Sequence, residues 1–263
     1  MRQLSLIILC LLIFSAAPAH AIEFSNVIII SIDALHPDAL SEKIAPSIFR
    51  MMKKGSYTLK GKSVDPPKTL ISHTAMITGL PPALNGKTDN DWKPGEARVS
   101  KETVFHIAKK LHYRTAYFYS KTKLGYLVND AIDLHQLAPD DGIKQARDFM
   151  GKGGKNFVFL HISSLEYAGS ESGWLSEAYL EAVSEIDAEL APFFDFVKDK
   201  GNYLLIITSD HAGHERLHGT QHPEDYKLPF VIVSDRHTYP GIQDRPYSVT
   251  ELKGILEKTL NAK

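Results

Sequence analysis

The chain has 263 residues, of which 30 are basic and 31 acidic, and its formal net charge is −1 with no block of basic residues. This balance makes polymeric nucleic acid a poor candidate partner. The single cysteine is Cys10, near the N-terminus, so the rest of the chain offers no disulfide, no cysteine nucleophile and no thiolate metal site.

Residues 1–21 have the pattern of a secretory signal peptide. Arg2 supplies a positive charge, the stretch Leu4 to Phe14 is almost wholly apolar, and Ala19-His20-Ala21 resembles a cleavage site. The apolar stretch is shorter than the about 20 residues that a spanning helix needs. We therefore predict an exported protein, periplasmic or secreted, without stable membrane insertion after cleavage and with one domain over 22–263. An uncleaved N-terminal anchor is the alternative.

In the first half of the domain, Val27 to Ile32 is a short β-branched run typical of a strand buried on both faces. Pro46 to Lys54 is predicted to be a helix that begins at a proline and ends at Gly55. The apolar period over Thr103 to Leu111 indicates another helix. Thr115 to Tyr119 is predicted to be a strand whose side chains alternate between the two faces of a sheet.

In the second half, Phe157 to Ile162, Tyr203 to Thr208 and Phe230 to Val233 are predicted strands. Leu175 to Val197 has the spacing of a long amphipathic helix. Ser248-x-x-Glu251 is a capping box that opens a last helix. Because strands alternate with helices, the sequence predicts an α/β fold, a three-layer sandwich around a mainly parallel sheet.

Ligands of such sheets bind beyond the carboxyl ends of the strands. Asp33 follows the first predicted strand, Asp210 and His211 follow a later one, and Glu166 follows the strand that ends at Ile162. Carboxylates and imidazoles are ligands that suit zinc. A single Asp at such a place more commonly caps a helix, and loop histidines are commonly solvated, so the pattern alone also permits a site without metal.

Thr69 follows Pro66 and Pro67 and begins a short predicted helix that ends at Gly79. A threonine hydroxyl in this position usually caps the helix. It becomes a nucleophile when a bound divalent cation lowers its pKa.

Three motifs in this order resemble the alkaline phosphatase superfamily, and its nucleotide pyrophosphatase/phosphodiesterase branch is the nearest match. They are Ile30 to Leu35, Lys68-Thr69-Leu70 and Thr208 to Gly213. The resemblance extends from about Val27 to Phe230. It implies an alkaline phosphatase-like core, and the short chain leaves no room for a large cap.

The resemblance also implies an activity, the hydrolysis of small phosphate esters or nucleotide-like substrates. Thr69 would attack phosphorus between two zinc-type ions and form a phospho-threonine intermediate. One ion would be held by Thr69 with Asp33, Asp210 and His211. Asn90 matches the asparagine that steadies a non-bridging phosphate oxygen.

For the second ion the sequence departs from the family pattern. Glu166 stands where the family has Asp, and Ser170 stands where it has His; the third ligand matches His218. Serine is a poor neutral zinc ligand. One arrangement brings in His214 or His222 as the replacement.

A second arrangement holds Mg or Mn through Glu166 and water. In a third, only one ion binds, and His218 with Lys68 handles the phosphate charge. The sequence leaves all three arrangements open.

The sequence also permits other functions and assigns roles to other residues. A phosphate monoesterase, or a catalytically impaired protein that binds metal and a phosphorylated ligand, is the alternative function. A sulfatase is disfavoured because the mature chain has no cysteine for conversion to formylglycine. Trp92, beside Asn90, is a hypothetical stacking partner for a substrate base or aryl group. His73 and His161 are interpreted as structural histidines.

Overall fold

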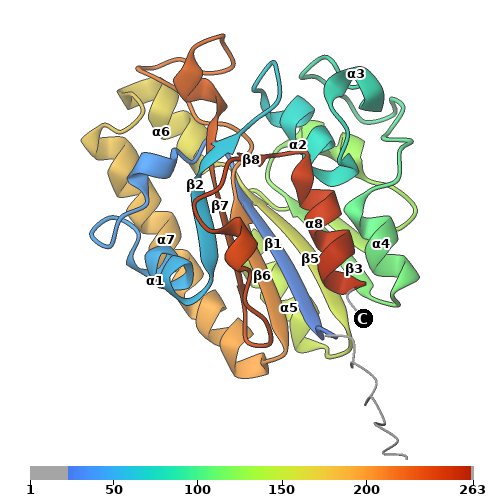
Figure 1. The fold of residues 1–263 in the computed structure, drawn as a ribbon. Helices are drawn as coiled ribbons and strands as arrows, with labels where there is room; N and C mark the ends of the chain where they lie inside the picture. Colours follow the sequence, from blue (N-terminus) through green and yellow to red (C-terminus); the bar gives the residue numbers. More distant parts are fainter. Residues whose placement is uncertain (1–22, 262–263) are drawn as a thin grey trace, which may run out of the picture.

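The computed structural model describes residues 23–261 as a sheet between two layers of helices (Figure 1). The predicted signal peptide, residues 1–21, lies outside the described part. Within residues 23–261, no helix is both long enough and apolar enough to cross a membrane.

The strands form one eight-stranded sheet in the order β4-β3-β5-β1-β6-β7-β2-β8. Neighbouring strands are parallel except where β7 pairs with β6 and with β2, so the prediction of a mainly parallel sheet is confirmed. Their bounds are β1 (Asn26–Ile32), β2 (Ser56–Lys62), β3 (Arg114–Tyr119), β4 (Leu134–Leu137), β5 (Asn156–Ile162), β6 (Tyr203–Thr208), β7 (Lys227–Ser234) and β8 (Tyr247–Ser248).

Strand β1 lies at the centre of this sheet, between β5 and β6. Its run of valine and isoleucine is fully buried, as β-branched side chains between two helix layers should be. Ile29 lies opposite Phe159 of β5 and Ile206 of β6, and all three pack in the core on one face. Ile28 and Ile30 point into the core on the other face.

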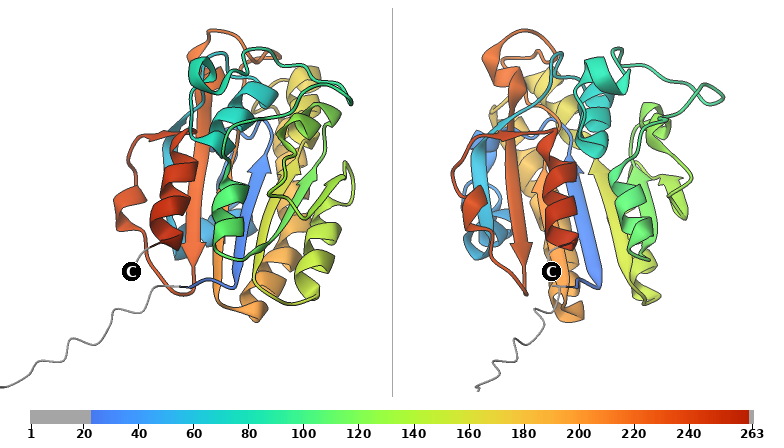
Figure 2. Two further views of the ribbon diagram at one scale, coloured as in Figure 1. Left: turned by 90° about the vertical axis from the view of Figure 1, so that its right-hand side faces the viewer. Right: turned by 45° about the vertical axis from the view of Figure 1, so that its right-hand side comes forward.

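Each core is closed by a layer of helices, as the views in Figure 2 show. One layer contains α1 (Pro46–Lys54), α5 (Gly142–Gly151) and α7 (Glu177–Lys200). The other contains α2 (Thr69–Thr78), α4 (Val104–Lys110) and α8 (Glu251–Leu260). The short helices α3 (Pro82–Asn85) and α6 (Ser164–Ser172) lie near the carboxyl ends of the parallel strands. This arrangement is the three-layer sandwich that the sequence predicts.

The long helix is displaced by two or three residues from its predicted bounds, Leu175 to Val197. The hydroxyl of Ser176 accepts a hydrogen bond from the Tyr179 backbone N–H at 3.3 Å and so fixes the start of α7. The helix ends before Gly201, whose φ of 62° favours glycine.

The parallel strands β3, β5, β1 and β6 are neighbours, so their carboxyl ends meet at one edge of the sheet. Asp33 follows β1, Lys121 follows β3, and Asp210 follows β6. Glu166 lies on α6, directly after β5, and Thr69 is the first residue of α2. The fold thereby gathers residues that are far apart in the sequence.

Candidate functional site

Three buried ligand-type atoms converge at this edge without hydrogen-bond partners: Oδ1 of Asp33, Oδ2 of Asp210 and Nε2 of His211. The His211 Nε2 lies 3.6 Å from Asp33 Oδ1 and 3.5 Å from Asp210 Oδ2. Leaving a buried polar atom unpaired costs about 1–3 kcal/mol, and more if it is charged. A divalent cation would satisfy all three atoms, and two carboxylates with one imidazole suit zinc. The residues present therefore fit a metal ion.

The other atoms of these side chains are hydrogen-bonded in ways that orient them. Asp210 Oδ1 accepts from the backbone N–H groups of Ala34 at 3.1 Å and His211 at 3.0 Å. The His211 Nδ1–H donates to the Ala212 carbonyl oxygen at 2.8 Å, which leaves Nε2 as the free lone pair. The ligands are thus held in place by the protein itself.

Ala34 adopts a left-handed conformation, with φ of 63°, which is strained for a residue other than glycine. Besides the bond to Asp210, its carbonyl oxygen accepts from the Tyr179 hydroxyl at 2.7 Å and from Trp174 Nε1 at 3.3 Å. These bonds hold the turn after β1 in the shape that directs Asp33 toward Asp210.

Thr69 is 1% exposed, and its Oγ1 lies at the positive end of the dipole of α2. Every residue of α2 is buried, and the helix ends at Gly79 with a φ of 71°. His73, one turn along, donates from Nδ1 to the Thr69 carbonyl oxygen at 2.7 Å and accepts from Ser31 Oγ at 2.9 Å. Burial lowers the pKa of His73 to about 4, so the ring is neutral, and it has the structural role that the sequence indicates.

Asn90 lies against the start of the same helix. Its Oδ1 accepts from the backbone N–H of Leu70 at 2.8 Å, which brings the side chain beside Thr69. Its Nδ2 makes no hydrogen bond to any residue between 23 and 261. The amide N–H groups are therefore available to a ligand at Thr69.

The stacking hypothesis for Trp92 is wrong. The side chain is only 6% exposed, because the indole packs over Gly125 in the core and donates to the Ala97 carbonyl oxygen at 3.0 Å. A ring in that position cannot stack on a substrate.

Lys121 is the residue at this site that the sequence reading missed. Its Nζ lies 2.6 Å from Asp33 Oδ2 and 3.4 Å from Thr69 Oγ1, and it also contacts Glu166 Oε2. Burial alone would raise the pKa of Asp33, but the charge of Lys121 and the hydrogen bond from His161 outweigh it and hold that pKa well below the usual value. Asp33 is therefore ionised, as a metal ligand must be.

His161 is a satisfied buried histidine, and its partner makes it part of the site. Its Nδ1 accepts from the Ser120 backbone N–H at 3.3 Å, so the proton is on Nε2 and is donated to Asp33 Oδ2 at 3.0 Å. The strand-end rule could have found His161, since it lies at the carboxyl end of β5.

Glu166 and His218 form the second half of the site. Glu166 Oε1 lies 3.1 Å from His218 Nε2, and the His218 ring stacks on the His211 ring with centroids 5.0 Å apart. Burial lowers the pKa of His218. Together with His211 they form a second group able to hold an ion. Ser170, one turn after Glu166, is exposed, and its side chain makes no hydrogen bond within the described residues.

The remaining candidates lie around the site. His214 Nδ1 is 2.6 Å from Asp225 Oδ1, and its ring stacks on His222 with centroids 3.8 Å apart, so these histidines form a cluster with Asp225. Lys68 packs over Gly219.

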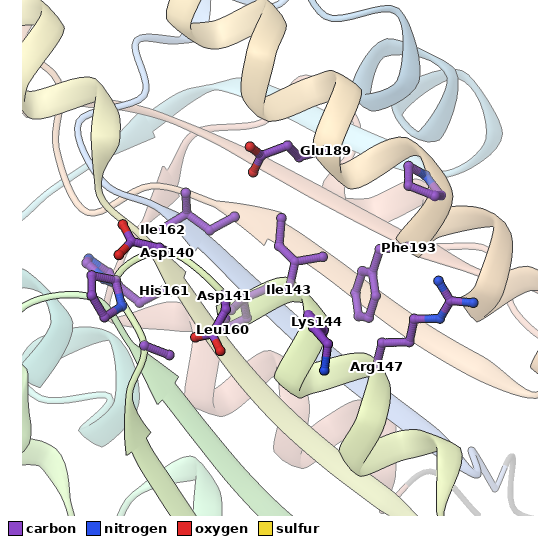
Figure 3. A pocket seen from close by; sticks show the side chains of 14 residues that line it. Asp140, Asp141, Ile143, Lys144, Arg147, Leu160, His161, Ile162, Glu189 and Phe193 are labelled. Atoms are coloured by element: carbon purple, nitrogen blue, oxygen red, sulfur yellow. The ribbon is translucent and has the colours of Figure 1, made fainter.

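A separate cavity of about 410 Å³ lies between α5 and α7, on the face of the sheet opposite α2 (Figure 3). His161 belongs to its wall at the end of β5, while Glu189 and Phe193 of α7 close the other side. Because Thr69 lies on the α2 side, this cavity is not the space in which a substrate would meet it.

The chain matches a known family and several solved structures. Residues 27–226 match the model of the type I phosphodiesterase / nucleotide pyrophosphatase family. Murine ectonucleotide pyrophosphatase / phosphodiesterase 5 superposes with a TM-score of 0.73 at 13% identity, covering 90% of this chain and 95% of the other. A Vibrio parahaemolyticus protein of the alkaline phosphatase superfamily gives 0.68 at 18% identity, covering 92% and 67%.

The 2-O glycosaminoglycan sulfatase BT1596 also has this fold, with a TM-score of 0.67 at 13% identity and coverage of 88% of this chain and 71% of the other. At such identities the structural likenesses establish the fold alone, which is that of the alkaline phosphatase superfamily. The family match spans most of the chain and supports a phosphoric ester hydrolase. The protein belongs to the type I phosphodiesterase / nucleotide pyrophosphatase family.

Proposed function

We propose that the protein is an exported, metal-dependent hydrolase of phosphate esters, of the phosphodiesterase or nucleotide pyrophosphatase type, with Thr69 as its nucleophile. The observation that carries this proposal is the convergence of three unpaired buried ligand atoms beside a threonine hydroxyl at a helix N-terminus. A structural cluster of this kind would have its polar atoms hydrogen-bonded.

The ion would be held by Asp33, Asp210 and His211 with Thr69, and zinc is the ion that this ligand set suits, with Mg or Mn as the harder alternatives. When bound, the ion would lower the pKa of the threonine hydroxyl and neutralise phosphate charge. The charge of Lys121 acts in the same direction, because its Nζ is 3.4 Å from Thr69 Oγ1.

In the proposed reaction, Thr69 Oγ1 loses its proton to solvent and forms a bond to phosphorus, while the bond from phosphorus to the leaving oxygen breaks. The leaving alkoxide takes a proton from solvent. Water then attacks the phospho-threonine, and the bond to Oγ1 breaks in turn. The net change is a phosphodiester plus water to an alcohol plus a phosphate monoester, and with a monoester the second product is phosphate. Asn90 would donate its amide to a phosphate oxygen in both steps.

Thr69→Ala tests the nucleophile, with bis-p-nitrophenyl phosphate and p-nitrophenyl phosphate as substrates. We expect this variant to lose turnover. It should still bind zinc at least in part, since the two carboxylates and His211 remain. Thr238→Ala, which removes an exposed threonine, is the matched control. Retention of most of the activity in Thr69→Ala would exclude the covalent route.

Phosphate monoesters are the second candidate substrate. The Nζ atom of Lys121 lies 3.4 Å from Thr69 Oγ1, so a positive charge stands beside the nucleophile. A dianionic monoester gains more from that charge than a diester does. Faster turnover of p-nitrophenyl phosphate than of the diester would favour this candidate. One tightly held ion with no turnover of either substrate would favour a binding protein.

A further inference from the structure

Lys121 occupies the place between Thr69, Asp33 and Glu166. Its ammonium contacts an oxygen atom of each of these three side chains. A cation bound between Glu166 and Thr69 would use the same oxygen atoms, at about 2.0–2.2 Å. An ammonium and a metal ion cannot both bind there, because the two positive charges would be in contact.

Both carboxylate oxygens of Glu166 lie close to a side-chain nitrogen. Oε2 contacts Lys121, and Oε1 lies 3.1 Å from His218 Nε2. The unpaired atoms of Asp33, Asp210 and His211 contrast with this. Among the described residues, the first group thus keeps three ligand atoms without a hydrogen-bond partner, whereas both oxygens of Glu166 lie close to side-chain nitrogens.

The net charge of the side chains in this cluster also favours a single divalent ion. Asp33, Asp210 and Glu166 carry three negative charges in a mostly buried cluster. One divalent ion and the Lys121 ammonium together neutralise them. The exposed Ser170 adds no third protein ligand that would make a second ion bind strongly.

We infer that Lys121 takes the place of a second metal ion, so that the site works with one divalent ion per chain. This inference rests on the proposed function of the first ion site. Lys121 would then donate to Thr69 Oγ1 and to a phosphate oxygen, and Glu166 would act as a positioning residue for Lys121 and His218.

The test is the number of zinc ions per chain, measured by mass spectrometry of the native protein and by calorimetric titration after chelation. The wild-type protein is expected to bind one ion. Lys121→Ala frees Glu166 and His218 and is expected to bind two, whereas Lys121→Arg keeps the charge and is expected to bind one. Lys144→Ala, which removes an exposed lysine of α5, is the control for loss of charge alone.

Glu166→Gln is the second variant, and it does not depend on Lys121→Ala folding. If Glu166 holds Lys121 rather than an ion, this variant still binds one zinc ion. Two ions in the wild-type protein, or a single ion in a folded Lys121→Ala variant, would overturn the inference. No bound ion in any variant would instead refute the first ion site, and with it the proposed function, so the two failures are distinguishable.

Discussion

The Nε2 atom of His161 lies 3.0 Å from Oδ2 of Asp33, and both side chains are buried. The contact fixes the carboxylate so that its other oxygen, Oδ1, stays unpaired beside His211. A histidine read from sequence as part of the core therefore orients a candidate metal ligand.

The first prediction follows from this contact. His161→Ala should weaken zinc binding by about 10- to 100-fold, the usual effect of removing a group that orients a metal ligand. Calorimetric titration of the metal-free protein measures it. His237→Ala, at an exposed histidine, should bind as the wild type does. Equal affinity in both variants would mean that Asp33 needs no support from His161.

Asn90→Asp separates the two roles of Asn90. The carboxylate keeps an oxygen that accepts from the Leu70 N–H, but it loses the amide donor and adds a negative charge. The melting temperature should therefore change little, while kcat falls by about 10²–10³, as on loss of one donor to a charged transition state. An unchanged kcat would restrict Asn90 to the capping of α2.

His73 makes the stability of the metal-free protein depend on pH. Burial lowers its pKa from 6.5 to about 4. Between these values the unfolded chain binds more protons than the folded chain, so this contribution to stability is complete above pH 6.5 and is lost as the pH falls toward 4. The loss is about 3 kcal/mol at most.

Urea unfolding at a series of pH values measures this loss. The His73→Gln variant has no titrating group at that position, so its stability should fall less than that of the wild type between pH 6.5 and 4. Parallel curves for the two proteins would contradict the assignment.

Two glycine substitutions should have effects of opposite sign. A Cβ on Gly213 would lie 2.5 Å from the Trp174 ring and 2.6 Å from the Leu217 carbonyl oxygen, so Gly213→Ala should destabilise the fold by about 1–3 kcal/mol. Gly254, inside α8, has no atom within 4 Å of such a Cβ, and Gly254→Ala should add about 1 kcal/mol of helix propensity. Denaturant unfolding measures both changes. Equal effects would mean that the Trp174 contact does not constrain the loop.

Sequence patterns predict those strands and helices whose apolar residues follow a clear pattern. The all-buried strand β1 and the apolar stripe of α7 are of this kind, and the strand-end rule then selects Asp33, Asp210 and His211. Strand β2 has alternate residues only partly buried, and β4 is exposed along its whole length, so neither has a clear apolar pattern.

Lys121 was missed for a different reason. It lies in Ser120-Lys121-Thr122-Lys123, a polar segment that resembles any surface loop. Its role depends on the position of β3 next to β5, which brings it against Glu166, and a sequence does not state the order of strands in a sheet. The residues that contact Glu166 can therefore be identified only from the folded structure.

The hydrogen bonds made by the backbone of Ala34 should affect tryptophan fluorescence. They connect a candidate oxygen ligand, Asp210, through the single residue Ala34 to the indole of Trp174, whose ring centroid also lies 5.5 Å from that of His218. The chain's only other tryptophan, Trp92, is buried in the core on the opposite face. Zinc addition should therefore change the tryptophan emission, and Trp174→Phe should abolish that change. The protein would contain its own fluorescent reporter of ion occupancy.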